Sequence, residues 1–176
     1  MKTLDQIISP IAAELQQFET FFGQTLKAET EPMNTIMQYV HETKGKRLRP
    51  ILVLLSAKLF GESNEQTLRA ATFVEMVHGA TLIHDDVVDD DDQRRGHASV
   101  KAQFGNLSAV LAGDYLLAKA MLLIANDTDI LNEMLQTTAA ALPRRSVLPV
   151  FPHCRWTRQT ADTGRKGFSA CLQPPA

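Results

Sequence analysis

Apolar residues recur every three or four positions over most of the chain, which is the spacing that places side chains along one stripe of a helix. The first stripe predicts one amphipathic helix and consists of Leu4, Ile8, Ile11, Leu15, Phe18 and Phe22. A short second helix is predicted over residues 33–41, directly after Pro32. A third is predicted over residues 50–59, because this segment begins with a proline and is followed by Gly61.

A fourth, longer helix is predicted after a capping box formed by Ser63 and Gln66. Its apolar positions are Leu68, Ala71, Val74, Val77, Leu82 and Ile83, and they lead directly into a cluster of aspartates. Residues 93–99 are polar and predict a loop, and two further helices are expected over residues 107–124 and 129–142. Because the sequence has no alternating strand pattern, hairpin dipeptide or internal repeat, the predicted fold class is all-α.

Composition limits the class of protein further. The 176 residues are 44% apolar and 22% charged with a net charge of −2, which describes a globular domain and excludes a disordered chain, a fibre or a general nucleic-acid binder. Cys154 and Cys171 lack metal-site or disulfide-framework spacing, so a cytoplasmic location is expected. We expect no signal peptide and no transmembrane segment, since the longest aliphatic run is residues 51–55 and a span needs roughly 20 residues.

The composition changes abruptly near residue 143. Residues 143–176 contain five of the eight prolines and carry a net charge of +5, whereas residues 1–142 carry −7. We therefore predict two parts, a helical domain over residues 1–142 and an atypical basic, proline-rich tail. The tail is interpreted either as a foreign, linker-like disordered segment or as the product of a shifted reading frame.

The most informative motif is HGATLIHDDVVDDDDQRRG, residues 78–96. On a helix, Asp85 and Asp89 are four residues apart and share one face, and His78 lies two turns earlier on nearly the same face. A divalent cation relieves the repulsion between two such carboxylates. Mg²⁺ suits this arrangement because it takes few protein oxygens and completes its shell with water and phosphate oxygens. The motif predicts a diphosphate held through the metal.

Two alternatives compete with this interpretation. An acidic run is most often a solvated helix end, and an EF-hand would also use acidic ligands, although its glycine and its final glutamate are missing here. Two features favour the metal site. Arg94 and Arg95 follow the acids directly, and apolar residues interleave the first of them: Leu82, Ile83, Val87 and Val88.

A basic cluster precedes the third predicted helix and comprises Lys44, Lys46, Arg47 and Arg49. Cations at a helix start suit a phosphate group, because they add to the positive end of the helix dipole. Taken alone, such a cluster is more often a solvated turn or a surface patch. Its link to phosphate depends on the presence of the aspartates and His78 in the same chain.

Four spaced motifs occur in one order along residues 1–142: GKRLRP, EMVHGATLIHDDVVD, RRG and GNLSAVLAGDYLLAKA. In these motifs the chain resembles the trans-isoprenyl diphosphate synthases, particularly their long-chain polyprenyl members. The resemblance implies an isoprenoid-synthase-type bundle around an apolar cavity and a homodimeric enzyme. It also implies Mg²⁺-dependent condensation of isopentenyl diphosphate with an allylic diphosphate.

The resemblance also implies roles for individual residues. The diphosphate of isopentenyl diphosphate would be held by Lys46, Arg49, His78 and Arg95. Asp85 and Asp89 would ligate the metals on the allylic diphosphate, with Asp86 supporting them and Arg94 touching the phosphates. The catalytic set is therefore expected to be Asp85, Asp86, Asp89 and Arg94.

The length of the product can be argued from the residues one turn before the first aspartate. Ala80 and Thr81 are small and would leave the cavity open for a long chain, with Met76 or Phe73 as its floor. The alternative is that Gly79 and Ala80 only permit close helix packing.

The family's second aspartate-rich segment and its later lysine are not found in this sequence. We therefore expect a truncated N-terminal part that is inactive or very weak and exposes an apolar patch. The alternative is a non-catalytic partner subunit of a heteromeric synthase, although a purely structural subunit has no use for an intact DDVVD motif. A plain helical interaction module would leave the basic cluster and His78 unexplained.

Overall fold

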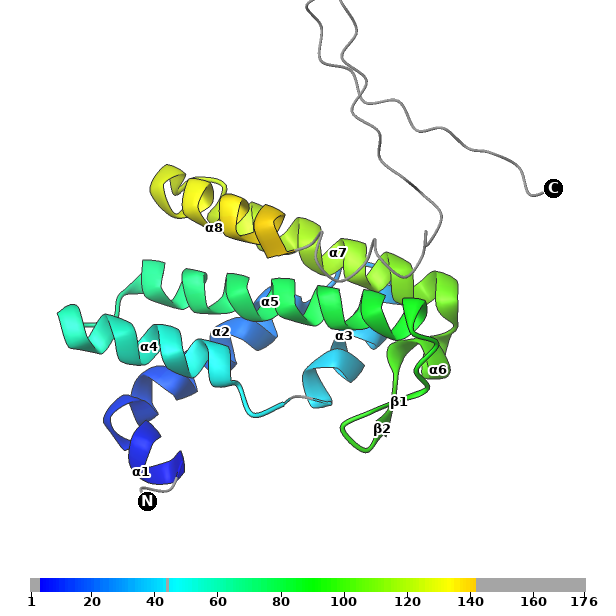
Figure 1. Ribbon diagram of the computed structural model, residues 1–176, viewed down its shortest axis with the longest axis horizontal. Coiled ribbons are helices and arrows are strands. Elements are labelled where there is room, and N and C mark those ends of the chain that lie inside the picture. Colours follow the sequence, from blue (N-terminus) through cyan, green and yellow to red (C-terminus); the bar gives the residue numbers. More distant parts are fainter. Residues whose placement is uncertain (1–3, 44, 142–176) are drawn as a thin grey trace, which may run out of the picture. The chain divides into compact units, whose positions relative to one another are not determined.

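The computed structural model describes residues 4–43 and 45–141 of the chain (Figure 1). Its elements are α1 (Leu4–Ile8), a 3-10 turn (Ser9–Ile11), α2 (Ala12–Leu26), α3 (Met33–Glu42), α4 (Leu48–Phe60), α5 (Glu65–Val88), β1 (Gln93–Arg94), β2 (His97–Ala98), α6 (Val100–Phe104), α7 (Asn106–Ile124) and α8 (Thr128–Ala141). The prediction of an all-α fold is confirmed. Chain contacts divide the protein into a first unit, Met1–Thr138, which contains every candidate site residue, and a remainder that begins at Ala139. The predicted tail lies outside the described residues.

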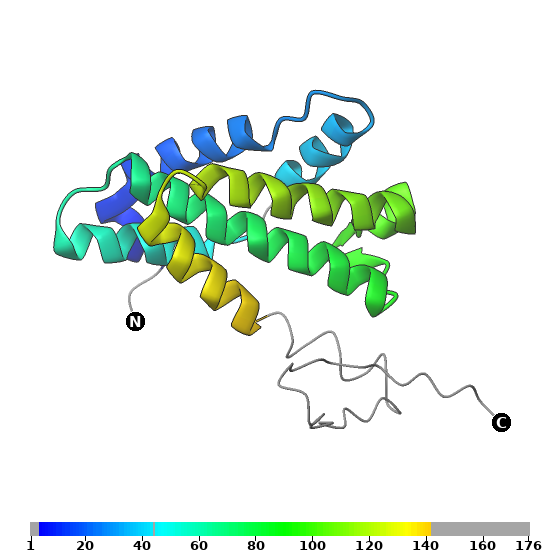
Figure 2. The ribbon, with the colours of Figure 1, turned by 90° about the horizontal axis from the view of Figure 1, so that it is seen from above.

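Helix α5 is the centre of the first unit. The contact between α5 and α7 is more extensive than that between any other two described elements. Helix α5 also contacts α4 and α2. Figure 2 shows α5 and α7 running side by side. The largest side chains that this packing buries completely include Phe18, Phe73, Ile11, Met37, Leu54, Met76, Leu116 and Ile124. Because α5 packs against α7, α4 and α2, the core defines the position from which its C-terminal half presents side chains.

The first predicted helix is interrupted. The structure has α1, a 3-10 turn and α2 in its place, so the prediction of one continuous helix is wrong. Pro10 lies in the 3-10 turn, and a proline lacks the N–H group that a helix interior requires. The apolar stripe nevertheless reaches the core, since Ile11, Phe18 and Phe22 are buried.

The start of α5 and the segment after it also differ from the prediction. The capping box is formed by Asn64 and Thr67: the amide of Thr67 donates to Asn64 Oδ1 at 2.9 Å, and the amide of Asn64 donates to Thr67 Oγ1 at 3.3 Å. Ser63 and Gln66 are therefore one residue out of register. The predicted loop over residues 93–99 contains the short antiparallel pair β1–β2, which periodicity over two residues cannot reveal.

Among the described residues, one helix meets the length and composition of a membrane span, namely α7. The prediction of no span rested on uninterrupted aliphatic runs, whereas α7 meets the broader criterion because it is long and apolar and contains only two charged residues, Asp114 and Lys119. One third of its apolar window is buried inside the structure. A core helix of a soluble protein meets the same criterion, and α7 packs along α5.

Gly113 on α7 leaves room for the side chain of His84, which lies on α5. A methyl group at this position would overlap the imidazole of His84, whose Nε2 lies 3.2 Å from the carbonyl oxygen of Val110. We expect Gly113→Ala to have a free energy of unfolding about 1–3 kcal/mol below that of Gly79→Ala, because only at position 113 must a ring leave its contacts. Gly79→Ala is the matched control: its Cβ would lie an ordinary 3.7 Å from Leu116, and alanine favours a helix over glycine by about 1 kcal/mol. Urea denaturation of both variants measures the difference, and equal effects would contradict the prediction.

Candidate functional site

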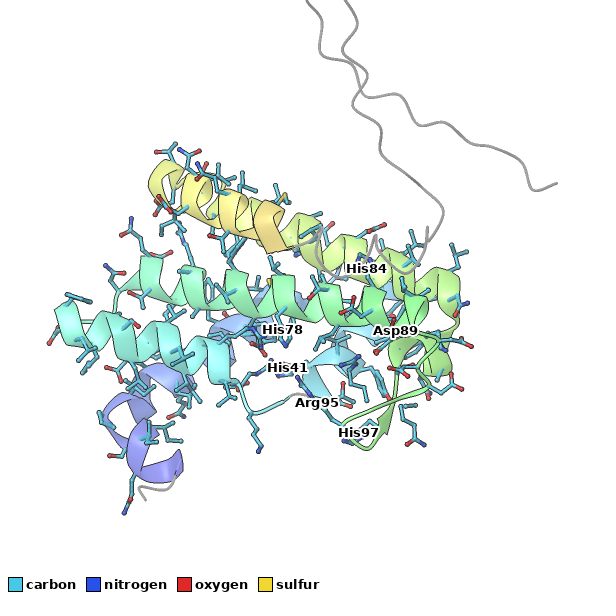
Figure 3. The ribbon with its side chains drawn as sticks, viewed as in Figure 1. His41, His78, His84, Asp89, Arg95 and His97 are labelled. Atoms are coloured by element: carbon cyan, nitrogen blue, oxygen red, sulfur yellow. The ribbon has the colours of Figure 1, made fainter. Side chains whose placement is uncertain are left out.

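The candidate site is built from three pieces of chain: the segment before α4, the C-terminal half of α5, and the β1–β2 segment that follows. Figure 3 shows His78 partway along α5, Asp89 at its C-terminal end and Arg95 on the following segment. The core holds α5, and the two flanking segments carry the cations. Residues more than forty positions apart in the sequence therefore share one region of the first unit.

A pocket of about 550 Å³ lies between these pieces. It is lined by Gly45, Lys46, Arg47, Leu48, Arg49, Glu75, His78 and Arg95. The structure thus brings together the four residues predicted to hold one diphosphate, and Lys44 lies outside the described residues. We call this space the basic pocket. The cationic side chains of Lys46, Arg49 and Arg95 belong to exposed residues, so they are accessible to an anion.

Gly45 explains how Arg95 reaches the basic pocket. The Arg95 guanidinium lies directly over Gly45, where any Cβ atom would overlap it. Arg95 itself has a left-handed backbone with φ of +55° and is followed by Gly96 at +82°. This turn aims the guanidinium back toward the segment before α4. A side chain at position 45 would therefore displace the Arg95 guanidinium from this place.

His78 is held uncharged by its surroundings. Burial, and after it the positive charge of Arg49, are the main causes that lower its pKa from the ordinary 6.5 to about 4. Glu75 opposes this shift, while Arg95 and Arg94 add to it. At neutral pH the imidazole is therefore a neutral hydrogen-bonding group among cations.

We expect the pKa of His78, measured by NMR titration of the imidazole Cε1–H signal, to lie near 4. The unfolded chain binds this proton at about 6.5 and the folded chain does not, so stability falls as the pH drops from 6.5 toward 4. Above pH 6.5 the group contributes no pH dependence. Adding pyrophosphate should raise the pKa, because the anion offsets the neighbouring cations. His78→Asn assigns the signal, and a pKa at or above 6.5 would contradict the expectation.

Asp85 and Asp89 occupy the same face at the end of α5. The amide of Asp89 donates to the Asp85 carbonyl at 2.8 Å, so the last helical turn continues up to Asp89. Asp85 is half-buried and Asp89 is exposed. No group of three or more His, Cys, Asp or Glu side chains that could hold a metal occurs among the described residues. This pair fits Mg²⁺, which accepts two carboxylates and takes its remaining ligands from water and phosphate.

Asp86 and Arg94 are bound to each other. Asp86 is only 2% exposed and accepts a hydrogen bond from Arg94 Nε at 2.7 Å, and Nη2 of the same guanidinium contacts the same oxygen. The hydrogen bond to Asp86 raises the pKa of Arg94. The pair ties the β1–β2 segment to α5. The predicted contact of Arg94 with phosphate therefore stays a prediction, and its first partner in this structure is a carboxylate.

Asp90, Asp91 and Asp92 hold the segment after α5 in place through contacts with Lys101 and Ser99. Lys101 is buried, and its Nζ atom lies 2.7 Å from Asp90 Oδ1 and 3.0 Å from Asp92 Oδ1. The Ser99 hydroxyl donates to the Asp91 carbonyl at 2.8 Å. The hydrogen bond from Lys101 lowers the pKa of Asp90. These contacts fasten the segment that carries the two arginines, and sequence inspection missed Lys101 because only its partners form a visible run.

The residues proposed as cavity wall and floor are buried in the core. Ala80 and Met76 are 1% exposed and Phe73 is 2% exposed. Thr81 is half-buried, and its hydroxyl donates to the His78 carbonyl at 2.9 Å. A second, smaller cavity of about 80 Å³ shares His78 and Arg95 with the lining of the basic pocket and is also lined by Met76, Ile83 and Asp86. The role of these positions in product length stays a prediction.

Comparison with known proteins places this fold and these motifs in one class. The chain belongs to the polyprenyl synthetase family, whose model matches residues 30–144. It is 36% identical over 144 residues to an all-trans-nonaprenyl-diphosphate synthase (geranyl-diphosphate specific) of Rhodobacter capsulatus, a match that covers 81% of this chain and 44% of the relative. It is 34% identical over 117 residues to the octaprenyl diphosphate synthase of Escherichia coli, covering 66% of this chain and 36% of the relative.

Solved structures agree with this assignment. A polyprenyl synthase from Caulobacter crescentus, crystallised with calcium and isoprenyl diphosphate, superposes with a TM-score of 0.73 at 28% identity over 78% of this chain and 42% of that one. A decaprenyl diphosphate synthase from Rhodobacter capsulatus superposes with a TM-score of 0.70 at 31% identity, covering 77% and 42%. The chain therefore spans less than half the length of these relatives.

Proposed function

We propose that this chain provides the isopentenyl diphosphate pocket and the first metal-binding aspartates of a trans-polyprenyl diphosphate synthase. In the proposed reaction, isopentenyl diphosphate condenses with an allylic diphosphate to form a long-chain all-trans product. The proposal rests on one observation. A single pocket is lined by Lys46, Arg49, His78 and Arg95, and His78 lies on α5, whose C-terminal end carries Asp85 and Asp89. The names of the relatives and the bound isoprenyl diphosphate of the Caulobacter protein support it.

The residues of the basic pocket suit a diphosphate chemically. Lys46, Arg49 and Arg95 supply charge to an anion that carries several negative oxygens. His78, neutral at pH 7, adds a hydrogen bond without adding to the repulsion among the cations. We propose that these four groups bind and orient isopentenyl diphosphate so that its double bond faces the allylic substrate.

Asp85 and Asp89 would hold Mg²⁺ at the other end of the site. When bound, Mg²⁺ stabilises the negative charge that develops on the departing allylic diphosphate. Asp86 holds Arg94 close to the same face of α5, so this guanidinium stands beside the leaving group in the proposed complex. The small side chains of Ala80 and Thr81 support a long product in this proposal, since no aromatic ring stands one turn before Asp85.

A second candidate role is that of one subunit in a two-chain synthase. The observation that favours it is a relative named heptaprenyl diphosphate synthase component 2 from Geobacillus stearothermophilus, 34% identical over 118 residues. In this role the chain would contribute its pocket and aspartates while another chain completes the cavity.

The proposal is tested by titrating the purified 176-residue chain with pyrophosphate in a calorimeter, with and without Mg²⁺. We expect binding in both conditions and tighter binding with Mg²⁺, and no binding in either would contradict the proposal. A condensation assay with radiolabelled isopentenyl diphosphate and farnesyl diphosphate then separates the two roles. We expect no turnover by this chain alone, and turnover only after addition of a second chain would favour the two-chain role.

A further inference from the structure

Arg47 behaves differently from the other cations of its cluster. It is only 9% exposed, while Lys46 and Arg49 are exposed on either side of it. Its backbone is left-handed, with φ of +52°, a conformation that costs free energy for a residue with a Cβ atom. The chain therefore turns sharply at this position, immediately before α4. The turn buries the guanidinium of Arg47, while the cations of Lys46 and Arg49 stay exposed.

The buried guanidinium is held on several sides. Its Nη1 atom donates to Glu75 Oε1 at 2.9 Å, and its Nε atom donates to Glu19 Oε1 at 3.3 Å. The group also lies over the ring of Phe22 at 4.3 Å and near that of Phe18 at 6.0 Å. These contacts join the start of α4 to both α2 and α5. Glu75 is itself only 8% exposed, so the pair is shielded from water.

The ion pair lies at the inner wall of the basic pocket. Arg47 and Glu75 both line that pocket, and Glu75 lies three residues before His78 on α5. The pair therefore spans the pocket from the segment that bears Lys46 and Arg49 to the helix that bears His78. Because Arg47 shares its charge with two carboxylates, it is poorly suited to bind a diphosphate itself.

We propose that the Arg47–Glu75 ion pair is a positioning device that sets the separation between the Lys46–Arg49 segment and His78, and so determines the affinity of the pocket for a diphosphate. This inference rests on the proposed function of the pocket. A buried ion pair contributes little net stability, because desolvation of both charges offsets their attraction. Nη2 of Arg47 is also buried and has no hydrogen-bond partner among the described residues, which adds to the cost. In this inference the pair contributes the fixed separation between the Lys46–Arg49 segment and His78, and not stability.

The test replaces both partners with apolar side chains in the 176-residue chain, as R47M/E75L. Removing the whole pair is expected to leave the midpoint of urea unfolding within experimental error of wild type or above it. The dissociation constant for pyrophosphate, measured by calorimetry, is expected to rise by about tenfold or more, since misplaced cations lose at least one charge-assisted hydrogen bond. Loss of affinity without loss of stability is the result that a purely structural pair would not produce.

Two further variants keep the test decisive. E75Q preserves the shape of the side chain and removes its charge. Its pyrophosphate affinity is measured at a temperature where E75Q is folded, so the pair can be tested even if R47M/E75L fails to fold. K58M breaks the exposed pair between Lys58 and Glu14, which are 2.6 Å apart and join α4 to α2 far from the pocket, and it should bind pyrophosphate like wild type.

The outcomes separate this inference from the proposed function. If the wild-type chain binds pyrophosphate and both E75Q and folded R47M/E75L bind it within about twofold of wild type, a change below 0.5 kcal/mol, the positioning role is overturned and the pocket assignment stands. If the wild-type chain does not bind pyrophosphate, the pocket assignment fails and the positioning role fails with it.

Discussion

Replacing Asp85 and Asp89 together by asparagine is expected to abolish the Mg²⁺-dependent part of pyrophosphate binding. The two carboxylates share the last turn of α5, and no third ligand stands beside them among the described residues. Loss of a supporting residue around a metal commonly costs about 10–100-fold in affinity, so loss of both ligands should cost at least about a hundredfold. Calorimetric titrations with and without Mg²⁺ measure this difference directly.

The matched control is Asp92→Asn, which neutralises an acid of the same run. Asp92 lies 3.0 Å from Lys101 and Asp90 lies closer, at 2.7 Å, so Lys101 keeps a partner in this variant. We expect its Mg²⁺-dependent binding to equal that of wild type. If Asp92→Asn and the double variant lose affinity equally, the acidic run acts through its total charge, and the assignment of Asp85 and Asp89 as ligands is wrong. Pyrophosphate binding without Mg²⁺ should persist in both variants, because the basic pocket is intact.

Replacing Phe18 by alanine is expected to lower the free energy of unfolding by about 3–5 kcal/mol, the usual cost of removing a large aromatic ring from a core. Phe18 is completely buried, packs against Phe22 with ring centroids 5.5 Å apart, and lies under the guanidinium of Arg47. The cavity left behind would separate α2 from the centre of the unit. Urea denaturation at constant pH measures the change.

Phe60→Ala provides the control for this prediction, because the ring at the end of α4 is 93% exposed. Its removal should change the free energy of unfolding by less than about 0.5 kcal/mol. If the two variants had similar midpoints, α2 would not be part of the cooperative core.

Local pattern was sufficient for most of the helices. Residues 33–41, 107–124 and 129–142 correspond within one or two residues to α3, α7 and α8, because a buried stripe repeats with the period of the helix. It was insufficient where a single residue interrupts the period, as Pro10 does, and where an element is too short to show any period, as in β1 and β2.

For the candidate site, too, the sequence predicted some features and left others to the tertiary structure. The resemblance to the family predicted Lys46, Arg49, His78 and Arg95 as one diphosphate-binding group, whereas residue type and spacing alone indicated only a basic cluster and an acidic run. They could not distinguish Arg47 from its neighbours, since all are cations in one run, nor reveal that Lys101 occupies Asp90 and Asp92. Burial and charge pairing separate these residues, and both depend on segments far apart in the chain.

The order of motifs, read from sequence alone, determined the family, the helical class and the residues that carry charge, because these properties are encoded by neighbouring positions. Tertiary structure alone decided which of those charges remain open to a ligand and which are neutralised. Glu19 and Glu75 reach Arg47 from helices that are distant in sequence, and Arg95 returns over Gly45 only through a left-handed turn. The free energy of a charge depends on what surrounds it in space, and that information appears only once the chain has folded.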